Sequence, residues 1–175
     1  MIFALLLFFA PPQEVRYWAD PCADSAKGCE TADAELAEWA MQAWQNASAG
    51  SLKARRVQNL DEAKIRVRWT GAREGLYGEV RGAEVYVRPA PREQDVLLRE
   101  TIMYLTCLHE IGHALGLRHT AHFEDIMYDF QYGGDIPEYF GRYRRKLKSR
   151  GDIRRNSGVS ESDKINLIIA LKEMR

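Results

Sequence analysis

The chain has 175 residues and a formal net charge of zero at pH 7. Hydrophobic residues make up 46% and charged residues 29%, a composition that is ordinary for a globular protein and excludes a fibrous or disordered chain. The balanced charge gives no global reason to expect nucleic acid as a partner. The length fits one domain, which we expect to cover residues 13–175.

The N-terminal ten residues, MIFALLLFFA, are uninterrupted apolar sequence and are followed by two prolines. A membrane-spanning helix needs about 20 apolar residues, so no stable membrane span is expected here. The run is typical of the apolar core of a secretory signal peptide, although no Lys or Arg precedes it. We therefore expect residues 1–12 to be a signal peptide and the protein to be exported. The alternative is a buried N-terminal strand.

Three cysteines bear on the redox environment of the protein. Export would permit a disulfide, and a bond between Cys22 and Cys29 would close a small ring in the loop-like stretch DPCADSAKGCE. Cys107 lies in an apolar run, so we expect it to be a small buried hydrophobe and not a reactive thiol.

The first predicted elements are a helix and a strand. Apolar residues recur at three-and-four spacing over residues 31–48, which indicates a helix. Thr31 is the expected N-cap, and Gly50 follows the helix end. Residues 64–70, KIRVRWT, alternate apolar and basic side chains with period two and predict a half-buried strand.

Two further strand signals follow. Residues 76–80 predict either a short strand or a bulged loop. Residues 84–88, EVYVR, alternate again and stop at Pro89. Because proline cannot donate to a strand ladder, we expect this strand to lie at a sheet edge.

Two helices complete the prediction. Residues 93–115 keep one face apolar and predict a long, central helix that ends at Gly116. The last helix begins near Ser160, where Asp163 three residues later forms a capping-box-like start.

Residues 109–119 read HEIGHALGLRH and suggest a catalytic metal site. His109 and His113 are four residues apart, so both imidazoles project from one face of a helix. Glu110 points slightly off that face and can reach a metal-bound water. Gly116 can adopt a left-handed backbone that turns the chain and returns His119 as a third ligand. Three protein ligands leave the fourth position open for water, as in catalytic zinc sites.

This stretch resembles the metzincin signature, which continues into a turn that packs a methionine beneath the ligands. Met127 in FEDIMYDF lies eight residues after His119 and is similar to that methionine. Within the clan, the chain looks most like matrixin-type peptidases. It departs from them at Asp129, where matrixins usually have proline and the astacin- and serralysin-like groups have a metal-binding tyrosine.

The resemblance implies an α+β, metzincin-like fold. It would have a twisted mixed sheet with an edge strand over the cleft, a long active-site helix, the methionine turn and a C-terminal helix. It implies that Val85, Tyr86 and Val87 form the edge strand, which a substrate peptide would join by β-augmentation. It also implies one catalytic Zn²⁺ and allows structural Ca²⁺. A second zinc site built from histidines is not expected.

The implied function is a secreted zinc endopeptidase that acts on peptide or protein substrates. Zinc held by His109, His113 and His119 would lower the pKa of its water. Glu110 would accept the proton as general base. Candidates for the pocket that selects the substrate follow the methionine turn: Tyr132, Ile136, Tyr139 and Phe140.

Other ways of completing the site stay open. His122 is an alternative to His119. A rival class of metallopeptidase uses a downstream glutamate as third ligand, for which Glu124 and Glu138 are the candidates. Cys22 is a candidate for capping the zinc in a latent form.

A different class of function is a catalytically silent zinc-binding module that binds peptides or polyanions. Residues 141–156 carry eight Lys or Arg and one acid, so the basic segment 142–155 is the candidate contact for anionic surfaces. The reading we favour for this segment is a solvated, mobile loop or helix surface.

Overall fold

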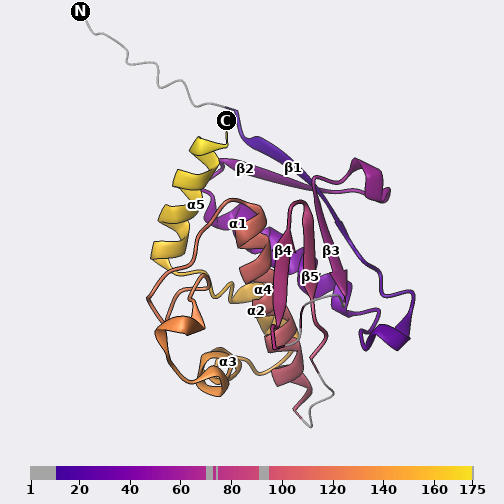
Figure 1. Cartoon of the computed structure of the whole chain (residues 1–175), viewed down its shortest axis with the longest axis vertical. Helices are drawn as coiled ribbons and strands as arrows, with labels where there is room; N and C mark the ends of the chain where they lie inside the picture. Colours follow the sequence, from indigo (N-terminus) through magenta and orange to yellow (C-terminus); the bar gives the residue numbers. More distant parts are fainter. Residues whose placement is uncertain (1–10, 70–72, 74, 91–94, 175) are drawn as a thin grey trace, which may run out of the picture.

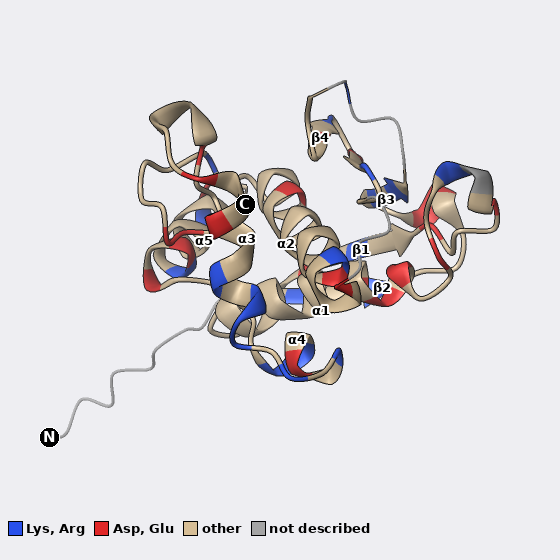
Figure 2. Cartoon of the chain, turned by 90° about the horizontal axis from the view of Figure 1, so that it is seen from below, with Lys and Arg blue, Asp and Glu red and all other residues tan. Residues whose placement is uncertain are grey.

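The structure, a computed structural model, describes residues 11–69, 73, 75–90 and 95–174. Most of the predicted signal peptide, residues 1–10, lies outside these residues. The predicted α+β class is confirmed, since a five-stranded mixed sheet packs against long helices. Figures 1 and 2 show α2 in the middle, with α3 and α5 on one side and β3 and β4 on the other. Among the described residues, no helix combines the length and apolar character that crossing a bilayer requires.

The sheet has the strand order β2-β1-β3-β5-β4. β1 is parallel to β2 and β3, and β3 is parallel to β5, whereas β4 and β5 are antiparallel. The strands are β1 Gln13–Ala19, β2 Leu52–Arg56, β3 Ile65–Trp69, β4 Gly78–Arg81 and β5 Glu84–Val87. The prediction found β3 and β5, left the region of β4 open between a short strand and a bulged loop, and missed β1 and β2.

The prediction that Val85, Tyr86 and Val87 form the edge strand is wrong. β5 lies between β3 and β4, and Val85 and Val87 are fully buried. The reason is a two-residue turn in which Gly82 takes a left-handed φ of +62° and folds the chain back so that β4 pairs with β5. The ladder ends before Pro89, so the proline is compatible with an interior strand.

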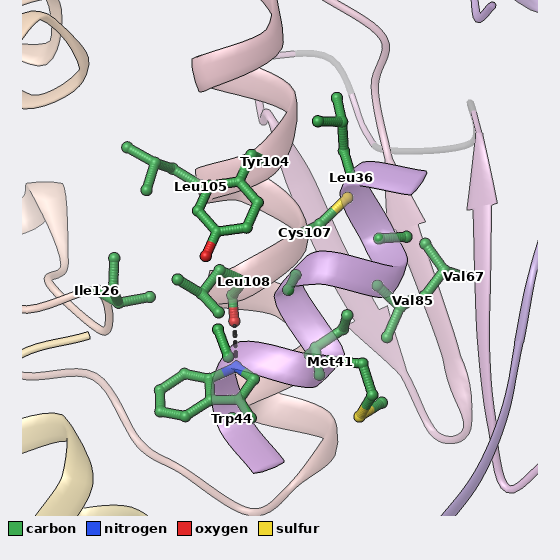
Figure 3. Close-up of a cluster of buried hydrophobic side chains, with 14 of the residues drawn as sticks. Leu36, Met41, Trp44, Val67, Val85, Tyr104, Leu105, Cys107, Leu108 and Ile126 are labelled. Carbon is green, nitrogen blue, oxygen red and sulfur yellow. Dashed lines mark hydrogen bonds between the residues drawn. The ribbon is translucent and has the colours of Figure 1, made fainter. Parts of the chain in front are cut away.

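Two helices cover one face of the sheet and form the core with it. They are α1 Asp33–Ala47 and α2 Val96–Ala114. In Figure 3 the Trp44 indole of α1 lies against α2, where its Nε1 donates to the Leu108 carbonyl at 2.8 Å. Cys107 is fully buried in this core, as predicted. The helices are therefore fixed to each other next to the histidine motif.

The N-terminal ends of α1 and α2 meet in a buried ion pair. Arg99 donates to both carboxylate oxygens of Asp33, at 2.9 and 2.8 Å. Asp33 also accepts from the Glu30 backbone N–H at 2.8 Å. The predicted N-cap, Thr31, is wrong: α1 is preceded by Ala32 and has no side-chain cap.

The C-terminal part is helical, and two of its helices were not predicted. The helices are α3 Ile136–Arg144, α4 Gly151–Arg155 and α5 Glu161–Glu173. α5 begins with the predicted capping box, in which Ser160 and Asp163 bond each other's backbone N–H groups. Three short 3₁₀ turns also occur, at Ser25–Lys27, Leu60–Glu62 and Phe130–Tyr132.

The basic segment 142–155 forms the end of α3, α4 and the turns between them, a helix surface and not a mobile loop. Figure 2 shows its cations around α4, interspersed with acidic residues. Arg144 pairs with Asp95 at the start of α2. Arg150 bonds Glu100 at 2.7 Å and lies over the Trp39 ring. Part of the positive charge therefore ties this segment to α1 and α2.

Candidate metal centre

Three histidines converge on one point. α2 carries His109 and His113, and the loop after α2 brings in His119. Their Nε2 atoms are 3.1 Å (109 to 113), 3.2 Å (109 to 119) and 3.0 Å (113 to 119) apart. Ligand nitrogens about 2.0–2.1 Å from a tetrahedral zinc lie about 3.3 Å from one another. The triangle therefore has the size of one face of a tetrahedral zinc site.

Each of the three imidazole rings has an oxygen atom within hydrogen-bonding distance of its Nδ1 atom. The His109 Nδ1 lies 2.7 Å from the Ile126 carbonyl oxygen, and the His113 Nδ1 lies 3.0 Å from the Leu117 carbonyl oxygen. The His119 Nδ1 lies 2.9 Å from the Asp129 carboxylate. An Nδ1–H that donates to oxygen leaves the Nε2 lone pair free for a metal. The donor set thus fits zinc in chemistry as well as in spacing.

The protonation of the centre favours metal binding. Burial, followed by the proximity of His113, lowers the pKa of His109 to about 3, and burial lowers the pKa of His113. Both imidazoles are therefore neutral near pH 7, the form that binds metal.

Burial, with a smaller contribution from the negative charge of Glu79, raises the pKa of the Glu110 carboxyl to about 8.

Gly116 makes the turn that carries the chain from α2 to His119. Its φ is +90°, in the left-handed region, and its N–H donates to the His113 carbonyl at 2.9 Å. The Leu117 N–H returns to the Gly112 carbonyl at 3.0 Å, which closes the helix end. Gly116 therefore lies where the sequence analysis expected it.

Met127 is fully buried and packs on Gly112 of α2, a glycine that the sequence analysis did not select. A Cβ added to Gly112 would lie 2.5 Å from the Met127 Sδ and 3.0 Å from Cζ2 of Trp44. The sequence did carry a signal for this contact, because a glycine inside a helix costs about 1 kcal/mol relative to alanine and therefore suggests a packing reason.

We expect Gly112→Ala to destabilise the protein by about 1–3 kcal/mol, because the added methyl overpacks a closed contact with Met127 and Trp44. Zinc affinity should fall as well, since Gly112 lies between the two helical histidines. Thermal unfolding and zinc titration would measure both effects. The matched control is Gly151→Ala in α4, where the nearest atoms are 3.9 Å away. There alanine should be neutral or stabilising by up to about 1 kcal/mol. Equal effects of the two variants would contradict the prediction.

Asp163 of α5 anchors the methionine turn, a role that the sequence analysis did not foresee. Its carboxylate accepts from the backbone N–H groups of Ile126 at 2.8 Å and Met127 at 3.3 Å, and from that of Ser160 at 3.0 Å. The Ile126 carbonyl in turn accepts from His109. A continuous set of hydrogen bonds therefore runs from the C-terminal helix to the metal centre.

A cleft of about 570 Å³ opens beside the histidines, and Glu110 lines it. Gly78 of β4 lies directly over Glu110, because a Cβ there would be 2.6 Å from the Glu110 Cγ. Of the four predicted pocket residues, Ile136, Tyr139 and Phe140 line the cleft. The prediction for Tyr132 is wrong, since its side chain is 61% exposed on the surface.

Other cleft residues were missed because they come from distant parts of the chain. Leu105 lies one turn before His109 on α2, Tyr77 precedes β4, and Phe130 follows the methionine turn. The Tyr77 and Phe140 rings are 5.2 Å apart, so the strand side and the α3 side of the cleft touch there.

The alternative ligands lie outside the centre. His122 and Glu124 are exposed, and Glu138 pairs with Arg145 at 2.5 Å. Cys22 forms a disulfide with Cys29, as the small-ring prediction had it, and so does not cap the metal. Within the described residues, His109, His113 and His119 are the group found with metal-binding spacing.

The fold and the three-histidine cluster are consistent with a zinc site of the metzincin type. The family model for Matrixin (peptidase M10) matches residues 92–136, which run from just before α2 through the methionine turn to the start of α3. The matrixin match and the histidine cluster together imply a zinc metallopeptidase domain. No curated protein matches the chain.

Proposed function

We propose that the protein is a zinc-dependent endopeptidase, with His109, His113 and His119 as the zinc ligands and Glu110 as the general base. The observation that carries the proposal is the convergence of the three Nε2 atoms at the floor of a cleft that Glu110 also lines. Bound zinc supplies a Lewis acid that activates water and polarises a carbonyl. This pairing of a metal site with an adjacent carboxylate supports metal-assisted hydrolysis, and the matrixin match supports a peptide bond as the bond that is cut.

The role of Glu110 follows from its surroundings. Glu110 is 7% exposed, and burial raises the pKa of its carboxyl. A general acid–base group works best when its pKa is near the working pH, and the positive charge of a bound zinc would favour the ionised form of Glu110, which accepts the proton. Glu110 would accept a proton from water in the cleft and deliver it to the leaving amine.

We assign substrate binding to β4, in place of the β5 residues first expected. β4 is the last strand of the sheet, and Gly78, Glu79 and Val80 line the cleft. An extended peptide can add to such an edge through backbone hydrogen bonds. Gly78 would then place the scissile bond close to Glu110, because its backbone lies against the Glu110 side chain.

The opposite wall of the cleft favours a large apolar substrate side chain. Leu105, Phe130, Ile136, Tyr139 and Phe140 contribute most of that wall. Tyr139 and Phe140 are 4% and 5% exposed, so their rings are held firmly in the core behind the cleft. Large apolar groups bury the most surface against such rings.

Tyr77→Ala is expected to change this preference without affecting zinc binding. The Tyr77–Phe140 contact closes part of the cleft, and an aromatic pair contributes about 0.5–1.5 kcal/mol. We expect a change of roughly two- to tenfold in relative kcat/KM between peptides with large and small apolar residues at the cut. Tyr132→Ala, which removes an exposed ring outside the cleft lining, is the control. An unchanged ratio in Tyr77→Ala would remove Tyr77 from the substrate site.

Export of the protein is part of the proposal. The Cys22–Cys29 disulfide supports it, because disulfides persist mainly in oxidising compartments.

The test is cleavage of a complex peptide mixture, read by mass spectrometry. The zinc-loaded protein would be compared with a chelator-treated sample and with Glu110→Gln. New peptide ends that vanish in both controls would support the endopeptidase, and the flanking residues would give its specificity. Zinc bound at one per chain without any cuts would instead favour the silent zinc-binding module.

A further inference from the structure

We propose that Asp129 is a positioning residue that holds His119 in the orientation needed to bind zinc. This inference rests on the zinc site of the proposed function. The Asp129 Oδ2 lies 2.9 Å from the His119 Nδ1. The other two histidines donate to backbone carbonyls, so among the described residues the carboxylate of Asp129 is the side-chain group that accepts from an Nδ1 atom of the centre.

The Asp129 carboxylate is itself fixed in place. Its backbone N–H donates to the Thr120 carbonyl at 3.1 Å, and the Thr120 N–H donates to the Met127 carbonyl at 2.8 Å. Its Oδ1 accepts from the Gln131 N–H at 2.9 Å, which caps the turn Phe130–Tyr132. These bonds join the residue after His119 to the methionine turn, so the carboxylate is preorganised toward the imidazole.

His119 is the histidine that most needs such a partner. Its side chain is 42% exposed, whereas His109 and His113 are partly buried on α2. An exposed side chain on a loop has more rotamer freedom, and fixing it costs conformational entropy. A charge-assisted bond to Nδ1–H limits that freedom and selects the tautomer whose Nε2 is free for metal.

The competing explanation is that Asp129 only caps the turn after it. Asp135 provides the matched control, because its carboxylate caps α3 through the Glu138 N–H at 3.2 Å. Asp135 lies in the same region and is not among the histidine partners. Asp135→Ala removes a cap alone, whereas Asp129→Ala removes a cap, the bond from the Gln131 side-chain amide and the imidazole contact. Asp129→Asn keeps an oxygen acceptor without the charge.

The first readout is zinc affinity, measured on the full chain by competition with a chromophoric chelator. Loss of a bond that orients a ligand weakens metal binding by about 10–100-fold. We expect that loss in Asp129→Ala, a smaller loss in Asp129→Asn, and wild-type affinity in Asp135→Ala. Equal affinities in the two alanine variants would overturn the inference.

The second readout is the nitrogen NMR signature of the imidazoles in the zinc-free protein. The wild-type His119 should show the single tautomer with hydrogen on Nδ1, and Asp129→Ala should show a mixture of tautomers. An unchanged signature would overturn the inference even if zinc affinity fell, because the loss would then come from folding.

These outcomes separate the inference from the proposed function. A wild-type protein that binds no zinc would overturn both. Wild-type zinc binding with unchanged affinity in Asp129→Ala would overturn the inference alone. Weakened zinc binding in Asp129→Ala, in a protein that cuts no peptide, would support the inference and contradict the peptidase.

Discussion

Glu110→Gln is expected to bind zinc as the wild-type protein does and to lose about 10²–10⁴-fold in peptide cleavage, the range that a general base contributes. Glutamine has nearly the same shape as glutamate, so the contact with Gly78 is preserved. The amide cannot accept the proton from water. Zinc titration and kcat/KM for a single fluorogenic peptide would measure the two effects on the same sample.

The matched control for this variant is Glu100→Gln. Glu100 is also a poorly exposed carboxylate of α2, but it pairs with Arg150 away from the cleft. This control should cleave the peptide at close to the wild-type rate. If Glu110→Gln cleaved as fast as Glu100→Gln, the role assigned to Glu110 would be wrong.

Asp163→Ala is expected to lower the free energy of unfolding by about 3–5 kcal/mol, because three backbone N–H groups lose their acceptor and each unsatisfied group costs about 1–3 kcal/mol. Asp163 is fully buried, so water replaces the carboxylate poorly. Zinc affinity should fall too, because the peptide group between Ile126 and Met127 donates its N–H to Asp163 and accepts from His109 through its carbonyl. Chemical denaturation and zinc competition would give the two numbers.

Asp152→Ala is the control that separates a loss of stability from a loss of zinc affinity. Asp152 also accepts from two backbone N–H groups, those of Lys148 at 2.9 Å and Ser149 at 2.8 Å, but it lies in the first turn of α4 and is not among the partners of the histidines. Its loss should reduce stability and leave zinc affinity unchanged. Wild-type zinc affinity in a folded Asp163→Ala protein would show that the methionine turn holds its position without α5.

The candidate ligands could be predicted because they are close together in the sequence. The spacing of His109 and His113 is set by one helical turn, and Gly116 supplies the left-handed residue that the return to His119 requires. Their oxygen partners could not be predicted in the same way. Two are backbone carbonyls, which carry no residue-type signal, and Asp129 was read only as a departure from a family pattern.

The sheet edge was mispredicted for a similar reason. The alternation in residues 84–88 correctly indicated a strand, but alternation does not say which neighbours a strand has. The turn at Gly82 decides that question by pairing β4 with β5. Tyr139 and Phe140 of the cleft wall belong to α3, which has 9 residues and is therefore shorter than the window of about 11–18 residues over which apolar periodicity indicates a helix.

The hydrogen bonds of Asp163 also set an order of events during synthesis. All three histidines are synthesised before Asp163, because chains are made and fold from the N-terminus. Until α5 docks, the methionine turn lacks the carboxylate that holds its N–H groups, and His109 lacks a fixed acceptor. The nascent chain thus contains the three histidine ligands before it contains the Asp163 carboxylate that fixes the methionine turn. Metal acquisition should be a late step of maturation, which would limit loading with the wrong ion while the chain is incomplete.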